Sequence, residues 1–304
     1  MIRLLAQTPS VLIQGITGKE GQRALEYMKV SGTEIVAGVT PGKGGQNVEG
    51  VPVYNTIREA IEAHPGINAT SMLVPPKFSL GAAQEAMEAG IKLIHIFAEN
   101  IPVQDTAKIL ELAQMHEARI IGPSAVGLII PGQWKLGSIG GSSDETFLPV
   151  QKTGGVAVLS KSGGMANTVA DMLTQAGVAQ SMVIGIGGDR LLGTAYADLL
   201  PDLTADPNTR GVVVIGEIGG SYEETLADEI IKKSFDKPVI AFISGLFAET
   251  LPQGVAFGHA GAIVNKSFGT RAGKILELEK AGAHIVNSPN EITDICLKLK
   301  LGGN

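Results

Sequence analysis

Along residues 1–128, short apolar runs alternate with longer segments in which apolar residues recur every three or four positions. The runs have the length of strands buried on both faces, and the longer segments have the spacing of amphipathic helices. We expect strands at 10–16, 34–40, 69–75, 91–98 and 117–123. This alternation predicts a parallel sheet with helices on both faces, so residues 1–128 should form a doubly wound Rossmann-type domain.

The alternation stops in residues 129–154, which show no helical pattern and are rich in glycine and proline. We interpret this stretch as an interdomain connection with room for a short hairpin. From 155 to 304 the alternation resumes, with expected strands at 155–160, 181–187, 211–217, 238–244 and 283–287. The accompanying helical patterns lie at 164–177, 194–203, 221–234, 270–281 and 289–299. The predicted fold class is therefore α/β, with a second doubly wound domain after the first.

Composition narrows the class of protein. Glycine makes up 40 of the 304 residues, and glycine-rich turns let a backbone approach a ligand closely. The net charge of −6 argues against nucleic acid as a partner. The single cysteine, Cys296, cannot form an intrachain disulfide, and no apolar run reaches the ~18 residues of a membrane span. We therefore expect a cytoplasmic protein that contacts neither nucleic acid nor membrane.

The first strand-to-helix turn carries glycines at 15, 18 and 21, with Thr17 between them. In a Rossmann-type domain this turn brings backbone N–H groups at a helix N-terminus close to a phosphate. After the second strand, where a dinucleotide-binding domain has an acid for the ribose, this sequence has Lys43 in a glycine-rich loop. A cation suits a phosphorylated ribose or a pyrophosphate. A tight turn without a ligand and an ordinary surface lysine are the alternatives.

Three glycine-containing turns follow strands of the second domain. Residues 160–165, Ser-Lys-Ser-Gly-Gly-Met, join a strand to a helix and offer hydroxyl and N–H groups to an anion. In the turn 216–220, Glu217 puts a carboxylate at the carboxyl edge of the sheet, where α/β proteins place their sites. A helix-capping acid is the alternative for Glu217. The third turn, 187–190, ends in Asp189 and Arg190.

His259 differs from the other histidines because small residues flank it, in the sequence Gly-His-Ala-Gly of residues 258–261. Such neighbours let a large group approach closely. A carboxylate such as Glu217 could fix the tautomer of the imidazole and leave its other nitrogen as a nucleophile. No cysteine or second histidine lies at ligand spacing in the sequence, so we expect no metal site. For a lone histidine, a structural role is the alternative.

Six motifs occur in the order shown by the α subunit of succinyl-CoA synthetase and the matching part of ATP-citrate lyase: GITGKEG, GVTPGKGG, SKSGGM, GIGGD, GEIGG and GHAGAI. The chain resembles this family over nearly its whole length. The resemblance implies a CoA-binding Rossmann-type domain at 1–128 and a flavodoxin-like ligase domain at 155–304. Their activity would be that of a nucleoside-diphosphate-forming acid–CoA ligase. On this resemblance His259 carries the phosphoryl group and Glu217 holds its imidazole.

The resemblance also implies ligand-binding residues and a partner. The residues expected to bind coenzyme A are Thr17, Gly18, Lys19, Glu20, Lys43, Phe97, Ala98 and Glu99. The residues expected to bind phosphate at the helix start are Ser160, Ser162 and Gly163. The family's ATP-grasp domain, which binds ATP and Mg²⁺, has no counterpart in this sequence. A separate ATP-grasp β-subunit is therefore the expected partner.

Three segments favour citrate as the acid. SKSGGMANT, GGDR and GPSAVG look like ATP-citrate lyase, whereas succinyl-CoA synthetases look like SRSGTLTYE, GGDP and GPNCPG. Gly164 leaves room for a tricarboxylate, Asn167 stands in place of an aromatic residue, and Arg190 adds a charge that a third carboxylate could use. The GVTPGKGG segment, in contrast, is closer to succinyl-CoA synthetases.

The resemblance to ATP-citrate lyase covers only part of that enzyme. That enzyme carries a citrate-synthase-like domain that cleaves citryl-CoA, and this sequence ends at Asn304 without one. We therefore expect a citryl-CoA synthetase, which makes the thioester from citrate, CoA and ATP through a phosphohistidine and a citryl phosphate. A succinyl-CoA synthetase or malate-CoA ligase α-subunit is the alternative. A CoA-binding regulator without catalysis is the third hypothesis.

Overall fold

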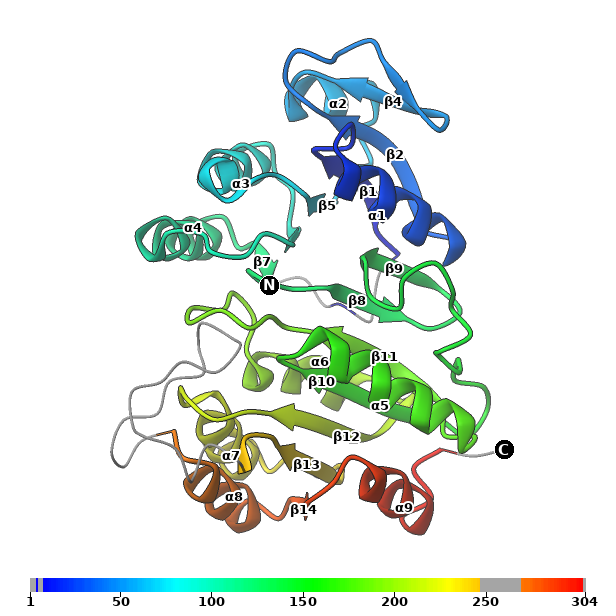
Figure 1. Cartoon of the computed structure of the whole chain (residues 1–304), viewed down its shortest axis with the longest axis vertical. Helices are drawn as coiled ribbons and strands as arrows, with labels where there is room; N and C mark the ends of the chain where they lie inside the picture. Colours follow the sequence, from blue (N-terminus) through cyan, green and yellow to red (C-terminus); the bar gives the residue numbers. More distant parts are fainter. Residues whose placement is uncertain (1–3, 5–7, 247–268, 303–304) are drawn as a thin grey trace.

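Two seven-stranded sheets with helices packed against them form the two halves of the chain (Figure 1). The computed structural model describes residues 4, 8–246 and 269–302. In spatial order, the strands of the first sheet are β3 (Asn47–Val48), β4 (Val51–Tyr54), β2 (Glu34–Val39), β1 (Ser10–Gln14), β5 (Ala69–Met72), β6 (Leu93–Ile96) and β7 (Arg119–Ile121). Its helices are α1 (Lys19–Val30), α2 (Ile57–Ala63), α3 (Ser79–Glu88), α4 (Val103–Met115) and the 3-10 helix η1 (Pro76–Phe78).

The doubly wound fold predicted for the first domain is confirmed, with one addition at the edge of its sheet. β3 and β4 form an antiparallel hairpin that the hydrophobic pattern did not predict. Its strands are too short to show a period of two. The connecting residues Glu49 and Gly50 have φ of 48° and 90°, and two positive φ values in a row are typical of a tight hairpin turn.

The second sheet continues the parallel arrangement. In spatial order, its strands are β14 (His284–Val286), β13 (Val239–Ile243), β12 (Thr209–Gly216), β10 (Gly155–Ser160), β11 (Gln180–Gly185), β8 (Gly127–Ile130) and β9 (Trp134–Gly137). The helices of this half are α5 (Gly163–Gln175), α6 (Leu200–Ala205), α7 (Tyr222–Lys233), α8 (Arg271–Lys280), α9 (Asn290–Lys298) and the 3-10 helix η2 (Tyr196–Leu199). The second doubly wound domain is thereby confirmed.

The stretch predicted as a connection contains most of the β8–β9 hairpin, which belongs to the second sheet. β8 runs antiparallel to β11, and it begins at Gly127, just inside the range 1–128 assigned to the first domain. The two strands of the hairpin approach so closely that a Cβ on Gly127 would lie 1.9 Å from the carbonyl oxygen of Leu136. Gly127 also has φ of +100°, so glycine is required there on two counts.

The core consists of apolar side chains on the central strands of both sheets. Val11, Leu12 and Ile13 of β1 have no exposed surface, and neither do Val156 and Val158 of β10. Consecutive buried residues show that these strands are covered on both faces, as expected for parallel sheets. Within the described residues, no helix has the combined length and apolar character that crossing a membrane requires.

Buried polar contacts fix the two halves relative to each other. Arg119 Nη1 in β7 lies 2.9 Å from Asp202 Oδ2 in α6, and their side chains are 5% and 2% exposed. Next to this pair, Thr194 Oγ1 donates a hydrogen bond of 2.7 Å to the carbonyl oxygen of Ile120. Removing one partner of a buried ion pair is strongly destabilising. The relative placement of the two sheets is therefore specified by polar geometry as well as by apolar packing.

Candidate functional site

A cavity of about 630 Å³ opens at the carboxyl edge of the first sheet. Its lining comes from the turn after β1, the end of β2, the segment after β5 and helix α3: Gln14, Gly15, Thr17, Gly18, Val39, Thr40, Pro41, Leu73, Val74, Pro75, Phe78, Gly81, Ala82 and Glu85. β1 lies between β2 and β5: the chain first adds β2, β3 and β4 on one side of β1 and then crosses to add β5 on the other side. Doubly wound proteins bind their ligands at such a switch point.

The glycines of the first turn are needed for close backbone contact. Gly15 has φ of +83°, and a Cβ there would lie 2.5 Å from the carbonyl oxygen of Leu73. A Cβ on Gly21 would lie 2.2 Å from the carbonyl oxygen of Gly15. Thr17 and Gly18 line the cavity, and the Thr17 hydroxyl donates a hydrogen bond of 3.2 Å to Thr40 Oγ1. On the side of the first turn, backbone and small residues therefore shape this cavity.

The other residues predicted to bind CoA lie around the cavity rather than in its described lining. Lys19 is exposed in the first turn of α1, and Glu20 there pairs with Arg23 at 3.0 Å. Lys43 is exposed on the loop after β2. Phe97, Ala98 and Glu99 follow β6, one strand beyond β5. A ligand that reaches all of them would have to extend out of the cavity along the carboxyl edge of the sheet.

In the second sheet, the turn after β10 is shaped by its own hydroxyl groups. Ser160 Oγ donates a hydrogen bond of 2.7 Å to the carbonyl oxygen of Ser162 and accepts one of 3.1 Å from the Ser162 N–H. Ser162 is the N-cap of α5, and its Oγ accepts a hydrogen bond of 3.4 Å from the N–H of Met165. The start of a thirteen-residue helix favours an anion, because its N–H groups and its dipole point there.

The two glycines that begin α5 differ in their surroundings. A Cβ on Gly163 would lie 2.3 Å from Cγ1 of Val126, so packing excludes a side chain at this position. A Cβ on Gly164 would meet no heavy atom within 4 Å. Gly164 is therefore not required by the packing of the described residues. Asn167, one turn further along, accepts a hydrogen bond of 3.1 Å from the Gly140 N–H through Oδ1 and so ties the 138–146 loop to α5.

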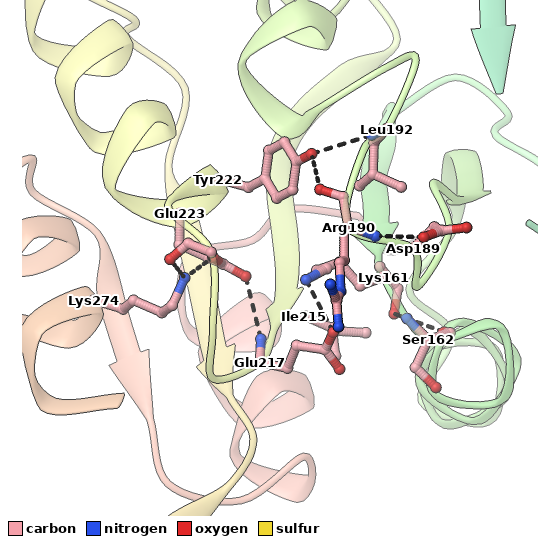
Figure 2. A network of polar contacts seen from close by, with 12 residues as sticks. Lys161, Ser162, Asp189, Arg190, Leu192, Ile215, Glu217, Tyr222, Glu223 and Lys274 are labelled. Carbon is pink, nitrogen blue, oxygen red and sulfur yellow. Dashed lines mark hydrogen bonds and ion pairs between the residues drawn. The ribbon is translucent and has the colours of Figure 1, made fainter. Parts of the chain in front are cut away.

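Glu217 lies at the end of β12, facing a lysine that the sequence analysis did not single out (Figure 2). Lys161 Nζ is 2.9 Å from Glu217 Oε1, and the two side chains are 1% and 11% exposed. The ammonium group also lies 5.5 Å from the centre of the Tyr222 ring, within the range of a cation–π contact. The turn after β10 and the turn after β12 are thus joined by a buried ion pair.

A second buried lysine supports the same turn from the other side. Lys274 of α8 forms an ion pair with Glu223 in which both side chains are fully buried. Glu223 Oε1 in turn accepts a hydrogen bond of 3.2 Å from the backbone N–H of Glu217. The sequence offered one signal for Lys274, because it lies on the same helical face as the buried Arg271 and Leu278.

Two tyrosines complete this polar network. Burial raises the pKa of Tyr196 well above its ordinary value, and the charges of Glu223 and Glu217 add to the effect. Its hydroxyl therefore stays protonated and donates a hydrogen bond of 2.7 Å to the carbonyl oxygen of Ile215. Burial also raises the pKa of Tyr222, whose hydroxyl donates a hydrogen bond of 3.0 Å to the carbonyl oxygen of Arg190. Both side chains act as fixed donors near neutral pH.

His259 lies outside the described residues, but the described residues on either side of its segment meet the Glu217 turn. Before the segment, the Ser244 N–H donates a hydrogen bond of 2.9 Å to the carbonyl oxygen of Gly216. After it, the carbonyl oxygen of Gly269 accepts one of 2.8 Å from the Gly219 N–H. Among the residues that the structure describes, no group of three or more His, Cys, Asp or Glu could hold a metal ion.

The two halves match two protein families. Residues 6–100 match the CoA binding domain, and residues 159–284 match the CoA-ligase domain. The succinate-CoA ligase [ADP-forming] α subunit of Aquifex aeolicus is 40% identical, over 98% of this chain and 95% of its own. A subunit of the ADP-forming sulfoacetate-CoA ligase of Bilophila wadsworthia is 41% identical, over 96% of this chain and 97% of its own.

Solved structures agree on the fold. The ATP citrate lyase of Methanothrix soehngenii, in complex with citrate and coenzyme A, superposes with a TM-score of 0.87 at 24% identity over 98% of this chain. The chain spans about half, 51%, of the length of that enzyme. At this identity the similarity concerns the fold alone.

A CoA-binding domain followed by a CoA-ligase domain defines a subunit of a CoA ligase. The full-length identities go one step further: the chain belongs to the family of α subunits of ADP-forming CoA ligases. Within this family, the sequence relatives favour the succinate alternative over the citrate that the three short segments predicted. The difference has a plain cause, since the citrate prediction depended on a few positions and the relatives match over nearly the whole chain.

Proposed function

We propose that this chain works with an ATP-grasp subunit to join a short dianionic acid, with succinate as the first candidate, to CoA while ATP is converted to ADP and phosphate. Two relatives that match over nearly their whole length are named as succinate- and sulfoacetate-CoA ligase subunits. Succinate and sulfoacetate both carry an anionic group at each end of a short chain. ATP and Mg²⁺ would be held by the partner subunit.

In the proposed reaction His259 carries the phosphoryl group. A ring nitrogen attacks the γ-phosphorus of ATP, the bond to ADP breaks, and the Glu217 carboxylate accepts a hydrogen bond from the other ring nitrogen as positive charge develops. A carboxylate oxygen of the acid then attacks phosphorus, which frees the imidazole and gives an acyl phosphate. The thiol sulfur of CoA attacks the acyl carbon; phosphate leaves with the thiol proton, and the thioester remains.

Each half of the chain would supply one binding site. CoA would occupy the cavity beside β1, with Thr17 and Gly18 against its phosphates and Lys43 outside the cavity mouth. The transferred phosphoryl group would lie at the start of α5, where Ser160 and Ser162 shape the turn. The N–H groups and dipole of that helix would stabilise its negative charge.

The observation that carries this proposal is the placement of Glu217. Its carboxylate is held by Lys161 at the carboxyl edge of the second sheet, beside the N-terminus of α5. The described flanks of the segment that contains His259 bond to the backbone of the same turn, at Gly216 and Gly219. A carboxylate, an anion-binding helix start and the ends of a histidine-bearing segment are what phosphohistidine chemistry requires.

The test is a substrate panel with the purified complex of this chain and its ATP-grasp partner. ADP release and CoA thioester would be measured with succinate, sulfoacetate, malate and citrate at equal concentration. We expect succinate or sulfoacetate to give the highest kcat/KM and the protein to carry an acid-labile phosphoryl group after incubation with ATP. A complex that makes no thioester with any acid and takes up no phosphate would contradict the proposal.

Citrate is the second candidate, because one observation favours it. The space around Gly164 is open, with no heavy atom within 4 Å of a Cβ placed there, and Gly164 lies in the first turn of α5. An acid bulkier than succinate would fit more easily beside a glycine than beside a β-branched residue. The same panel distinguishes the candidates, since citrate would then give the highest kcat/KM.

A further inference from the structure

Lys161 has an unusual environment for a lysine. It belongs to the turn between β10 and α5, yet its side chain is only 1% exposed. Burying an ammonium group is costly unless a partner of opposite charge offsets the lost hydration. Here Glu217 Oε1 at 2.9 Å supplies that charge, and the face of Tyr222 at 5.5 Å adds to it.

The backbone around Lys161 is held without its side chain. The Lys161 N–H donates a hydrogen bond of 3.3 Å to the carbonyl oxygen of Ile215. The Ile186 N–H donates one of 2.8 Å to the carbonyl oxygen of Ser160. These bonds tie the turn after β10 to both neighbouring strands, so the ammonium group is not needed to keep the turn in place. Its direct effect is on the Glu217 carboxylate.

Two buried lysines thus hold Glu217 in different ways. Lys161 contacts the carboxylate directly, whereas Lys274 contacts Glu223, which accepts from the Glu217 backbone N–H. A Cβ on Gly216 would lie 2.7 Å from Glu223 Oε1, so the backbone here is packed closely against that acid. The backbone of the turn and the direction of its carboxylate are set by separate contacts.

On the basis of the proposed function, we propose that Lys161 is a positioning residue that acts on His259 through Glu217. Its ammonium group, 2.9 Å from Oε1, offsets the charge of the Glu217 carboxylate and fixes its orientation. A carboxylate has room for more than one donor, so an ion pair through Oε1 is compatible with a hydrogen bond from an imidazole. An ionised, immobile acceptor fixes the tautomer of the ring and stabilises the imidazolium character that develops when phosphorus is attacked.

Other charged and titratable groups also surround Glu217. Glu223 and Lys274 act on the backbone, as described above. Arg190 extends from the turn after β11 in the direction of Glu217, and Tyr196 and Tyr222 are protonated donors to backbone oxygens (Figure 2). The proposal is based on the ion pair between Lys161 and the Glu217 carboxylate.

The test uses the complex of this chain with its ATP-grasp partner. The rate at which ATP phosphorylates the complex is measured as acid-labile phosphate over a range of pH. Lys161→Met keeps the length of the side chain but removes its charge. We expect a rate lower by about ten- to a hundredfold, the order of effect expected when a close pair of opposite charges is lost. We also expect the acid limb of the pH profile to move to higher pH, because the buried carboxylate loses the cation that favours its ionised form. Lys161→Arg should restore both.

Lys135 offers a matched control. It is another fully buried lysine paired with a carboxylate at 2.9 Å, here Asp144, but it lies in β9 at the far edge of the same sheet. Lys135→Met should lower the thermal unfolding temperature and leave the shape of the pH profile of phosphorylation unchanged. If both methionine variants shift that profile equally, the effect of Lys161 is merely structural and the inference is wrong.

The remaining outcomes are also decisive. Phosphorylation of Lys161→Met at the wild-type rate with an unshifted profile would overturn the inference, as would a Lys161→Arg variant as impaired as the methionine one. If Lys161→Met does not fold, Lys161→Gln and Lys161→Arg carry the same comparison. A wild-type complex that takes up no acid-labile phosphate would refute the proposed function itself, whereas a phosphorylated wild type with insensitive variants refutes only the role of Lys161.

Discussion

The two candidate sites of this chain are built from different materials. At the turn after β1, the cavity is shaped by closely packed backbone, with Gly15 in a left-handed conformation and Gly21 packed against its carbonyl oxygen. The site at the end of β12 is instead a network of buried charges, in which Lys161 and Glu217 pair directly. Backbone approach suits a large ligand that must be held along its length, whereas fixed charges suit a step in which charge moves.

This contrast predicts which kinds of substitution impair each site. The first site should respond mainly to steric changes and to the loss of cations at its rim. The second should respond to the loss of single charged or nucleophilic groups, by larger factors. Variants at each site should therefore differ in the size and the kind of their effect.

His259→Ala should abolish acyl-CoA formation and uptake of acid-labile phosphate, while CoA binding stays near the wild-type value. A covalent carrier takes part in both half-reactions, so its loss lowers the rate by many orders of magnitude. Turnover of the purified complex and calorimetric CoA binding would measure the two effects.

His284→Ala is the control for this variant, because His284 is exposed on the edge strand β14. It should keep full turnover. A His259→Ala complex that retains more than a few per cent of turnover would refute the phosphohistidine, and equal losses in both variants would point to a general effect on folding.

His95 is a buried histidine of the first half and should make the stability of the chain depend on pH. It is fully buried in β6; Nδ1 is 2.9 Å from Ser71 Oγ, and Nε2 is 2.8 Å from the carbonyl oxygen of Ala125. Burial lowers its pKa from 6.5 to about 4. The unfolded chain therefore takes up a proton as pH falls below 6.5, and the folded chain does so only near 4, so stability is lost across that window.

The expected loss in the free energy of unfolding is roughly 3 kcal/mol between neutral pH and pH 4, since each unit of pKa difference corresponds to about 1.4 kcal/mol. Chemical denaturation at several pH values would measure it. His95→Gln should flatten the decline in this window, whereas His116→Gln at the end of α4 should not. Equal acid sensitivity in the wild type and in His95→Gln would show that other groups cause the decline.

Local patterns in the sequence predicted the first site better than the second. The glycines at 15, 18 and 21 indicate a close turn, because the backbone atoms that crowd a side chain at Gly18 and Gly21 belong to the same short segment of sequence. Lys161 lies inside the SKSGGM motif, but its partner Glu217 follows another strand, β12. Pairing between strands depends on sheet order, which the hydrophobic pattern does not specify. Asn167, which is expected to bind the acid, also accepts a hydrogen bond from Gly140, and the hydrophobic pattern does not specify that contact either.

The fold shows the same division. The long alternating segments predicted both doubly wound domains, because many residues contribute to each hydrophobic pattern. The short hairpin β3–β4 was not predicted from the sequence, and for β8–β9 the sequence indicated only room for a hairpin. Strands of two to four residues carry little periodicity. Their signals are local: Gly50 in a tight turn, and Gly127 where two backbones touch.

Lys43→Ala should weaken CoA binding about tenfold and leave phosphorylation by ATP unchanged. The side chain is exposed on the loop after β2, outside the described lining of the cavity, so its contact with a CoA phosphate would be partly screened. Loss of a charged hydrogen bond removes about 1.5–3 kcal/mol, and screening favours the lower figure. Titration with CoA measures the change, and Lys152→Ala, exposed in the second half, is the control. An unchanged dissociation constant would identify Lys43 as ordinary surface charge.

The smallest effect is expected at Gly164. Although this residue belongs to the second site, a change there alters the space available to a ligand and not a charge. Gly164→Thr should leave stability within about 0.5 kcal/mol of the wild type, because a Cβ there meets no heavy atom within 4 Å. Gly163→Ala is the contrasting variant; its Cβ would lie 2.3 Å from Val126 Cγ1, so it should unfold at a lower temperature.

If the acid binds beside α5, Gly164→Thr should lower kcat/KM several-fold for citrate and less for succinate, because added bulk excludes the larger acid first. The ratio of the two kcat/KM values is the measurement. An unchanged ratio would place the acid away from Gly164 and remove the one observation that favours citrate.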